Sequence, residues 1–383
     1  MNVRQEFEDR LAAQLAQLRG GGVLRQMRVP AGIDLVSNDY LGLADHPHLK
    51  ETMNAALTDL PAGSGGSRLL RGHHQIFDAL EERLASFAGS ESALLFGSGY
   101  AANIGLLQAV VSSDDLIVSD ERNHASLIDG IRLTKATTAI YPHQDLNALE
   151  AALSRSRRGR AIVITESVFS MDGDLTPLRD VCAIAERAGA LVIVDEAHAT
   201  GMYGARGSGR VEELGLRDRV IATMHTGGKA LGSGGAWVAG SRALRDVMVN
   251  SARSFIFSTA PLPVLGAALN AGLDVIRREP ERRREVHRKS SLLRSALAAA
   301  GVQAIGESMI VPIIAGTNDA ALGLQSDVMA AGFDVRAIRP PSVPAGTARL
   351  RVTVRYPVPD SDLVRFAGVV RGSDPTRELS HFR

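Results

Sequence analysis

The sequence has a single cysteine, almost no net charge and no long apolar run, and each shortage excludes a class of protein. One cysteine, Cys182, cannot form an intramolecular disulfide and fits a reducing compartment. Lysine and arginine number 43 against 42 acidic residues, which gives no general attraction to nucleic acid or to an anionic membrane. No run reaches the length of a transmembrane helix. Residues 1–18 are amphipathic and lack the apolar stretch of a signal peptide, so we expect a cytoplasmic protein.

Short apolar runs alternate with helical patterns through the middle of the chain. The segments between the runs repeat their apolar residues at helical spacing and end in glycine, as in 178–189, where Cys182 would be a core residue. This alternation predicts an α/β fold with a mostly parallel central sheet covered by helices on both faces. The expected strands are 92–96, 115–119, 161–165, 190–194, 220–224 and 236–240.

From about residue 275 the pattern changes to that of a smaller α+β region. One long charged helix is expected over 274–301, and short strands are expected within 309–314, 333–337 and 349–354. We therefore divide the chain into three parts, with the N-terminal helix packing on the smallest domain. The parts are an N-terminal helix and arm (1–45), a large α/β domain (46–275) and a small C-terminal α+β domain (276–383).

Two groups of residues resemble functional motifs without completing them. The letters DEAH at 195–198 match a helicase box, but a helicase also needs a phosphate loop of the form GxxxxGK[ST]. Around Lys229 that loop is absent, because position 223 is Thr and position 230 is Ala. The candidate metal ligands are too few and too loosely spaced for a zinc site, so we expect no metal. They are His73, His74, Asp195 and His198.

The stretch GSGYAA at 97–102 follows an expected strand and precedes an expected helix. It has the outline of the dinucleotide fingerprint, with Asp120 about twenty residues further on. Physically it indicates only that a helix N-terminus with small residues can bind a phosphate, and a monophosphate would fit equally well. A nicotinamide-dependent dehydrogenase is therefore an alternative, but it leaves Lys229, Asp195 and His198 without a role.

Polar side chains gather where the expected strands end, at the edge where open α/β sheets bind ligands. Lys229 lies in TMHTGGKALGSGGA (223–236), where glycines allow a flat group to approach the backbone and a lysine amine can react with a carbonyl. Such a set suits pyridoxal 5′-phosphate (PLP), which needs an amine, a carboxylate for its ring nitrogen and a helix terminus for its phosphate. The residues are His124, Ser170, Asp195, His198, Thr226 and Lys229.

These residues lie in motifs that resemble those of the α-oxoamine synthases, a family of fold-type I PLP enzymes, over nearly the full length of the chain. The resemblance implies a fold-type I PLP-dependent transferase. The matching segments are SNDYLGL (37–43), GSGGSRL (63–69), FGSGYAAN (96–103), NHASLIDG (123–130), TESVFSMDGD (165–174), VDEAHATG (194–201) and TGGKALG (226–232).

One more motif narrows the activity that the resemblance implies. AIRPPSVPAGTARLRVT (337–353), together with GSGGSRL, resembles the member that condenses L-alanine with a pimeloyl thioester and releases CO2 in biotin biosynthesis. Whether coenzyme A or acyl carrier protein carries the acyl group stays open. So does a sister enzyme that uses glycine with a short acyl-CoA or serine with a long one. A PLP-free, inactive partner subunit would not need Lys229.

The resemblance also implies a role for each matching position. Lys229 would hold PLP as a Schiff base, Asp195 would pair with the pyridine nitrogen, and His124 would stack on the ring and orient the acyl carbonyl. The other cofactor ligands would be His198 at the 3′-oxygen, Ser170, Thr226, the backbone at Gly99 and Tyr100, and Ser258 and Thr259 from the second subunit of a homodimer with shared active sites. The substrate contacts would be Arg25, His124, Arg339, Ser342 and Arg351, with Arg351 holding the amino-acid carboxylate. The chain departs from the family at Phe77, usually histidine, at Ser342, usually threonine, and at Gly227–Gly228, often one larger residue.

Overall fold

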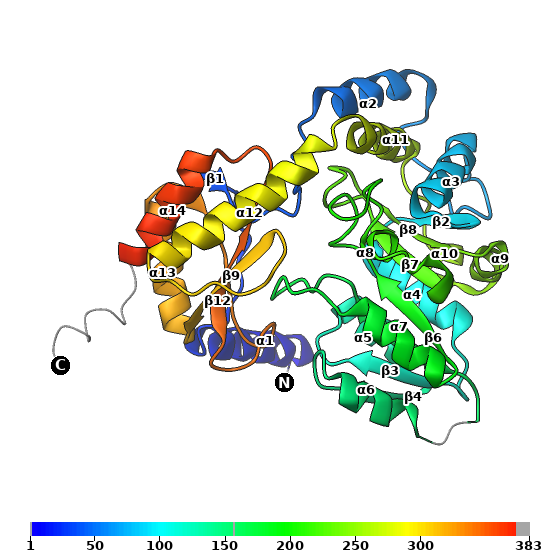
Figure 1. Ribbon diagram of the computed structural model, residues 1–383, viewed down its shortest axis with the longest axis horizontal. Coiled ribbons are helices and arrows are strands. Elements are labelled where there is room, and N and C mark those ends of the chain that lie inside the picture. The colour runs from blue at the N-terminus through cyan, green and yellow to red at the C-terminus, as the bar shows by residue number, and fades with distance from the viewer. Residues whose placement is uncertain (1, 156–157, 373–383) are drawn as a thin grey trace.

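A seven-stranded sheet forms the centre of the larger part of the molecule in the computed structural model, which describes residues 2–155 and 158–372 (Figure 1). Its strand order is β2-β8-β7-β6-β5-β3-β4. The strands from β4 to β7 run parallel, whereas β8 is antiparallel to both of its neighbours, so the prediction of a mostly parallel sheet is confirmed. The strands are β2 (Ser92–Phe96), β3 (Leu116–Asp120), β4 (Thr137–Tyr141), β5 (Ala161–Glu166), β6 (Ala190–Asp195), β7 (Ala222–Thr226) and β8 (Ala236–Gly240).

Six of these strands lie within two residues of the predicted positions, and β4 was not predicted. Strand β4 lies at the edge of the sheet, and three of its five side chains are exposed. Its sequence therefore contains no continuous apolar run from which residues 137–141 could be predicted as a strand. One boundary matters for the site. Strand β7 starts at Ala222 rather than at residue 220, and Thr226 is therefore its last residue instead of following it.

Alternate residues of the central strands face two different helix layers. Ile162 and Ile164 of β5 pack in a core with α4 and α5, whereas Ala161 and Val163 pack in another with α6 and α7. Cys182 lies fully buried in the second core, as predicted. The helices of this part are α2 (Pro47–Asp59), α3 (Gln75–Ala88), α4 (Gly99–Val110), α5 (Ala125–Thr134), α6 (Leu146–Leu153), α7 (Leu178–Arg187), α8 (Arg210–Glu213), α9 (Arg242–Ser251), α10 (Arg253–Ile256), α11 (Pro263–Arg278) and the short 3₁₀ helix Arg217–Arg219.

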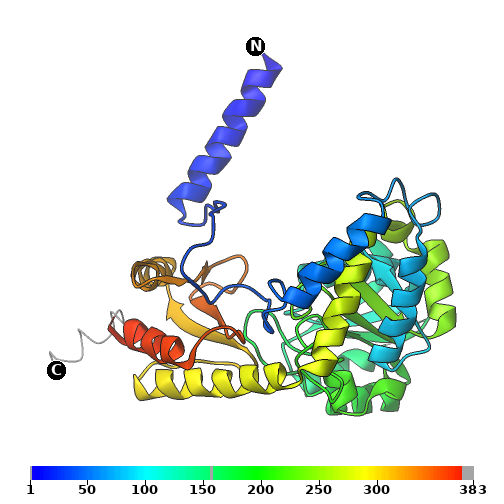
Figure 2. The same ribbon diagram turned by 90° about the horizontal axis from the view of Figure 1, so that it is seen from above.

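A small antiparallel sheet in the order β11-β12-β9 forms the C-terminal part, where α12 and α14 pack against each other (Figure 1). Its elements are α12 (Glu281–Ala299), β9 (Ile310–Gly316), α13 (Asn318–Ala330), β11 (Ala337–Ile338), β12 (Ala348–Thr353) and α14 (Asp360–Gly372). The N-terminal arm joins this part through β1 (Ile33–Asp34), which pairs in parallel with β10 (Phe333–Asp334). Helix α1 (Val3–Gly20) instead projects away from the rest of the molecule and has no buried residue (Figure 2). The expectation that this helix packs on the small domain is wrong, and the domain boundaries at 45 and 275 stay predictions.

The long charged helix predicted over 274–301 is in fact two helices. Helix α11 ends at Arg278 and α12 begins at Glu281, with Glu279 in a non-helical conformation between them. Pro280 causes the break, because proline has no N–H to donate and disfavours the helical conformation in the residue before it. Helix α12 then runs from the large sheet region to the small sheet (Figure 1). Within the described residues, no helix combines the length and the apolar character that crossing a membrane would require.

Candidate active site

A cavity of about 190 Å³ lies at the carboxyl ends of β5, β6 and β7, where seven of the predicted site residues meet. Asp195 and Thr226 close β6 and β7, and Glu166 closes β5. The carboxyl ends of parallel strands share one edge of the sheet, which is why residues far apart in sequence converge here. The seven predicted residues are Gly99, Tyr100, His124, Asp195, His198, Thr226 and Lys229, and Asn103, Ser126, Glu166, Ala197 and Met224 complete the lining.

Asp195 is a buried carboxylate that forms no ion pair with the described residues. It is 4% exposed, and its oxygens accept hydrogen bonds from Asn103 Nδ2 and from the Ala197 N–H, both at 2.8 Å. No lysine, arginine or histidine nitrogen of the described residues forms an ion pair with it within 4.0 Å. A buried charge is costly unless a partner compensates it. The carboxylate of Asp195 is therefore an acceptor that fits the protonated ring nitrogen of PLP.

Asn103 also ties Asp195 to His124. Its Nδ2 donates to Ser126 Oγ at 2.9 Å, and His124 Nδ1 lies 2.8 Å from that oxygen and accepts from the Ser126 N–H at 3.2 Å. Because Nδ1 accepts, Nε2 is the nitrogen that carries the proton and remains free to donate. Desolvation, reinforced by the charge of Lys229, lowers the pKa of His124 and favours this neutral form.

A tyrosine fixes the proton of the second histidine. Tyr40 Oη lies 2.5 Å from His198 Nδ1 and 3.3 Å from Asn38 Oδ1, and burial raises the pKa of Tyr40 to about 12, so the phenol keeps its one proton and donates it over the shorter contact, to Nδ1. Burial and the nearby charges of Lys229 and Arg351 hold the pKa of His198 well below its usual value. His198 is thus a neutral imidazole whose Nε2–H is the available donor, as contact with a ring oxygen requires.

Lys229 stands in a loop whose backbone is crowded. A Cβ at Gly227 would overlap Gly234 O and Leu269, so no larger residue fits there, whereas a Cβ at Gly228 would meet only Thr226 Oγ1 at 3.6 Å, an ordinary contact. Burial lowers the pKa of Lys229, against the attraction of Asp195 and Glu166, which increases the fraction of neutral, nucleophilic amine.

Glu166 is a site residue that the sequence reasoning missed. It pairs in register with Asp195 on the neighbouring parallel strand, and its Oε1 is buried without a hydrogen-bond partner among the described residues. Burial, and secondly the charge of Asp195, raise the pKa of Glu166 well above its usual value, so the protonated form is favoured. Asn103 and Tyr40 were missed as well. All three stand inside the quoted motifs, and Asn103 also lies one helical turn after Gly99.

Arg351 is tied to the loop that carries Ser170. Its Nε donates to Ser170 O at 2.6 Å and its Nη2 donates to Asn38 Oδ1 at 3.0 Å. Ser170 and Ser342 both line a second cavity of about 530 Å³ between this loop and the segment 341–344. Neither Ser170 nor Arg351 lines the cavity of Lys229.

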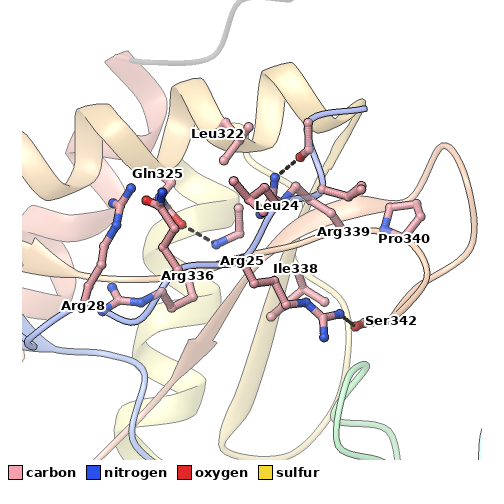
Figure 3. A pocket seen from close by; sticks show the side chains of 14 residues that line it. Leu24, Arg25, Arg28, Leu322, Gln325, Arg336, Ile338, Arg339, Pro340 and Ser342 are labelled. Carbon is pink, nitrogen blue, oxygen red and sulfur yellow. Dashed lines mark hydrogen bonds between the residues drawn. The ribbon is translucent and has the colours of Figure 1, made fainter. Parts of the chain in front are cut away.

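The other predicted substrate residues meet in a third cavity of about 510 Å³, between the N-terminal arm and the small domain (Figure 3). Arg25 Nη2 donates to Ser342 Oγ at 2.9 Å, and Arg339 Nη1 donates to Gly22 O. Arg28 and Arg336 add two more guanidinium groups to the lining (Figure 3). The structure thus brings Arg25, Ser342 and Arg339 together.

Ser258 and Thr259 lie apart from all of these cavities. Both are exposed, in the segment between α10 and α11. Within one chain they therefore do not join the Gly99 turn in the cavity of Lys229. A contact with a phosphate there would require a second copy of the chain.

Comparison with known proteins gives a consistent result. Residues 30–369 match the family model described as aminotransferase class I and II. The chain is 44% identical over 373 residues to the 8-amino-7-oxononanoate synthase of Geobacter sulfurreducens, an alignment covering 93% of this chain and 95% of that protein. It is 45% identical over 350 residues to the 8-amino-7-oxononanoate synthase of Mycolicibacterium smegmatis, covering 90% and 91%. The structure superposes on serine palmitoyltransferase from Sphingomonas wittichii with a TM-score of 0.90 at 26% identity, covering 99% of this chain and 100% of that one.

Proposed function

We propose that the chain condenses L-alanine with a pimeloyl thioester. It belongs to the class I and II aminotransferase family and, within that family, to the 8-amino-7-oxononanoate synthases. The reaction is PLP-dependent, forms a carbon–carbon bond, and yields 8-amino-7-oxononanoate, CO2 and the free thiol carrier of biotin biosynthesis. The observation that carries the proposal is the convergence of Lys229, Asp195, His124 and His198 on one cavity.

PLP supplies an electron sink for the electron pair released at the α-carbon of alanine. Asp195 would hold the ring nitrogen in its protonated form, and Asn103 orients that carboxylate. Lys229 would bind the cofactor through its amine and then, once free, take the α-proton. Its lowered pKa suits both tasks, since an ammonium ion can do neither.

Two residues would then position the reacting groups. His198 offers its Nε2–H to a ring oxygen, a direction fixed by the hydrogen bond from Tyr40. Arg351 would receive the alanine carboxylate with its guanidinium fork, a geometry that suits bidentate recognition. Its hydrogen bond to Ser170 O links the substrate residue to a loop that also serves the cofactor.

The acyl side should be selected through charge. Pimeloyl carries a terminal carboxylate that acetyl and palmitoyl chains lack, and Arg25 with Ser342 offers it a guanidinium and a hydroxyl that are already within 2.9 Å of each other. Alanine differs from glycine by one methyl group, worth about 1 kcal/mol of discrimination. Acyl specificity should therefore exceed amino-acid specificity.

Release of CO2 with matched substrate pairs tests the function. The purified enzyme loaded with PLP is given alanine or glycine, each with pimeloyl, acetyl or palmitoyl thioester, and kcat/KM is compared on one preparation. Alanine with a pimeloyl thioester should be fastest. Faster turnover of glycine with acetyl-CoA, or of serine with palmitoyl-CoA, would assign the chain to a sister activity.

We also propose a homodimer with shared active sites, supported by the exposed position of Ser258 and Thr259 in one chain. Each would reach the phosphate of the partner's cofactor. Mixing inactive Lys229→Ala with an inactive Thr259→Ala variant should then restore activity in hybrid dimers. Hybrids that form but stay inactive would contradict the shared site. The compartment we propose is the cytoplasm, in keeping with Cys182 as a buried free thiol.

A further inference from the structure

A cavity of about 390 Å³ lies at the junction of α3, α11 and α12 and shares no residue with the three cavities described above. Four arginines and no acidic residue line it, and its apolar surface comes from Phe87, Leu273 and Ile276. The full lining is Arg83, Ser86, Phe87, Ala205, Arg206, Leu273, Ile276, Arg277, Pro280 and Arg283. Nothing in the proposed reaction uses these side chains.

The acids around this cavity do not balance its arginines. Arg83 Nη2 lies 2.8 Å from Asp274 Oδ1, and Arg277 Nη2 lies 3.8 Å from the same oxygen, so two guanidinium groups share one carboxylate. Arg206 pairs with Glu212 at 3.0 Å. Among the described residues, two carboxylates thus pair with three of the four arginines, which leaves positive charge in excess.

Among the lining arginines, Arg283 forms no ion pair with the described residues. Its Nη2 donates to Ala205 O at 3.1 Å, its Nη1 is buried without a hydrogen-bond partner, and no carboxylate of the described residues lies within 4.0 Å. The guanidinium packs against Gly207, at which a Cβ would overlap Nη1, so the head group is held in place. Burial lowers the pKa of Arg283, and the charge of Glu212, which forms no ion pair with it, only partly offsets this.

We propose that this cavity binds a small organic carboxylate with an apolar body. Arg283 and Arg277 hold the carboxylate, for which the planar guanidinium fork is suited, and the apolar body packs against Phe87 and Ile276. The volume lies within the range of small-molecule sites, which combine an apolar lining with a few convergent polar groups.

The position of the cavity links its occupant to both parts of the molecule. Pro280 and Arg283 stand at the start of α12, the helix that runs on to the small sheet (Figure 1). Ala205, whose carbonyl accepts from Arg283, belongs to the loop after β6. In the same loop Gly201 lies so close to Ala230, the neighbour of Lys229, that a Cβ on Gly201 would be 2.6 Å from Ala230 Cβ. A carboxylate bound at Arg283 therefore lies where α12 already contacts a loop that borders the cavity of Lys229.

Calorimetric titration of the PLP-loaded enzyme tests the site, with 4-phenylbutyrate as the probe and 4-phenylbutan-1-ol as its uncharged analogue. The carboxylate should bind saturably and the alcohol should not. Arg283→Gln should weaken binding by about tenfold or more, since a charge-assisted contact is lost. Arg284→Gln is the matched control, because Arg284 is the next residue of α12, is exposed and does not line the cavity.

A second pair of variants keeps the test valid if Arg283→Gln unfolds. Arg277→Gln should weaken binding, whereas Arg278→Gln, at the exposed neighbouring position, should not. The affinity should also persist with saturating alanine and in Lys229→Ala. Absence of saturable binding, equal affinity in the arginine variants, or loss of binding in Lys229→Ala would each overturn the inference. None of these readouts depends on turnover, so a failure of the proposed reaction would be seen separately.

Discussion

Replacing His143 by glutamine should remove a part of the folding stability that depends on pH. The imidazole lies between two carboxylates, with Nδ1 2.9 Å from Asp120 Oδ1 and Nε2 2.6 Å from Asp174 Oδ2, and its side chain is 10% exposed. Burial alone would lower the pKa of His143, but hydrogen bonds to the two aspartates outweigh this and raise the pKa to about 9. The folded protein therefore holds this proton more tightly than the unfolded chain does.

The size and the sign of the effect follow from linkage. A rise of the pKa from 6.5 in the unfolded chain to about 9 in the folded protein corresponds to about 3 kcal/mol. Because the folded pKa of His143 is raised, the stabilisation is complete below pH 6.5 and is lost as the pH rises through 9. Glutamine cannot carry the charge, so the variant should lack this window.

Urea unfolding tests this prediction. The wild-type protein and His143→Gln are unfolded at a series of pH values between about 6 and 10, and their free energies of unfolding are compared. The difference in free energy of unfolding should be largest near pH 6 and should shrink by about 3 kcal/mol by pH 10. Groups that titrate equally in both proteins cancel in this difference. His287→Gln is the control, since His287 Nε2 contacts the backbone carbonyl of Met202 at 2.9 Å. A His143 difference that stays constant with pH would refute the reasoning.

Three further predictions concern the cofactor site. Borohydride reduction of the loaded enzyme should fix the mass of the cofactor on the peptide that contains Lys229, and a label on another lysine would overturn the assignment. Asp195→Asn should still bind PLP but exchange the α-proton of alanine roughly a hundredfold more slowly, whereas wild-type exchange would leave Asp195 a structural role only. Tyr40→Phe should weaken PLP binding several-fold in a fluorescence titration, because His198 loses the donor that fixes its proton, with little change in the thermal midpoint. Unchanged PLP affinity in Tyr40→Phe would show that another contact orients His198.

The central strands could be predicted because they are buried on both faces. Strand β5 begins with four consecutive apolar residues and β6 with five, and such runs stand out in any sequence. Strand β4 can be recognised only from its pairing with β3 in the structure, because its own residues are partly exposed and partly buried. The break between α11 and α12 had a local signal in Pro280, and the charged helical pattern on both sides concealed it.

The cavity of Lys229 could be predicted for the same reason, since strand ends are a local feature and the edge they share follows from the fold class. Lys229, Asp195, Thr226 and His124 were all placed by this argument. Glu166 was within its reach, as the last residue of β5, but a buried acid beside another acid is not expected from pattern alone. The burial that favours its neutral form is a property of the packed structure.

The link between the two parts of the molecule could not be predicted, because it joins residues far apart in the chain. Asp172 Oδ2 lies 2.5 Å from Arg122 Nη1, while Oδ1 accepts from Arg349 on β12. Two residues further along the same strand, Arg351 donates to Ser170 O. Because alternate residues of a strand point to the same face, Arg349 and Arg351 both contact the loop that carries Ser170 and Asp172.

This arrangement holds Arg351, the proposed carboxylate-binding residue of the C-terminal part, against the loop that follows β5. Arg351 belongs to β12, yet its guanidinium is held by Ser170 O of the β5 loop and by Asn38 of the N-terminal arm. Each partner comes from a different part of the chain, so no single domain fixes the distance between Arg351 and Lys229. The loop 167–176, which contacts Arg351 through Ser170 O, is anchored in turn by Asp172 and by the His143 pair with Asp174. The geometry that would hold an amino-acid carboxylate near the cofactor amine therefore rests on buried ion pairs that only the folded chain brings together.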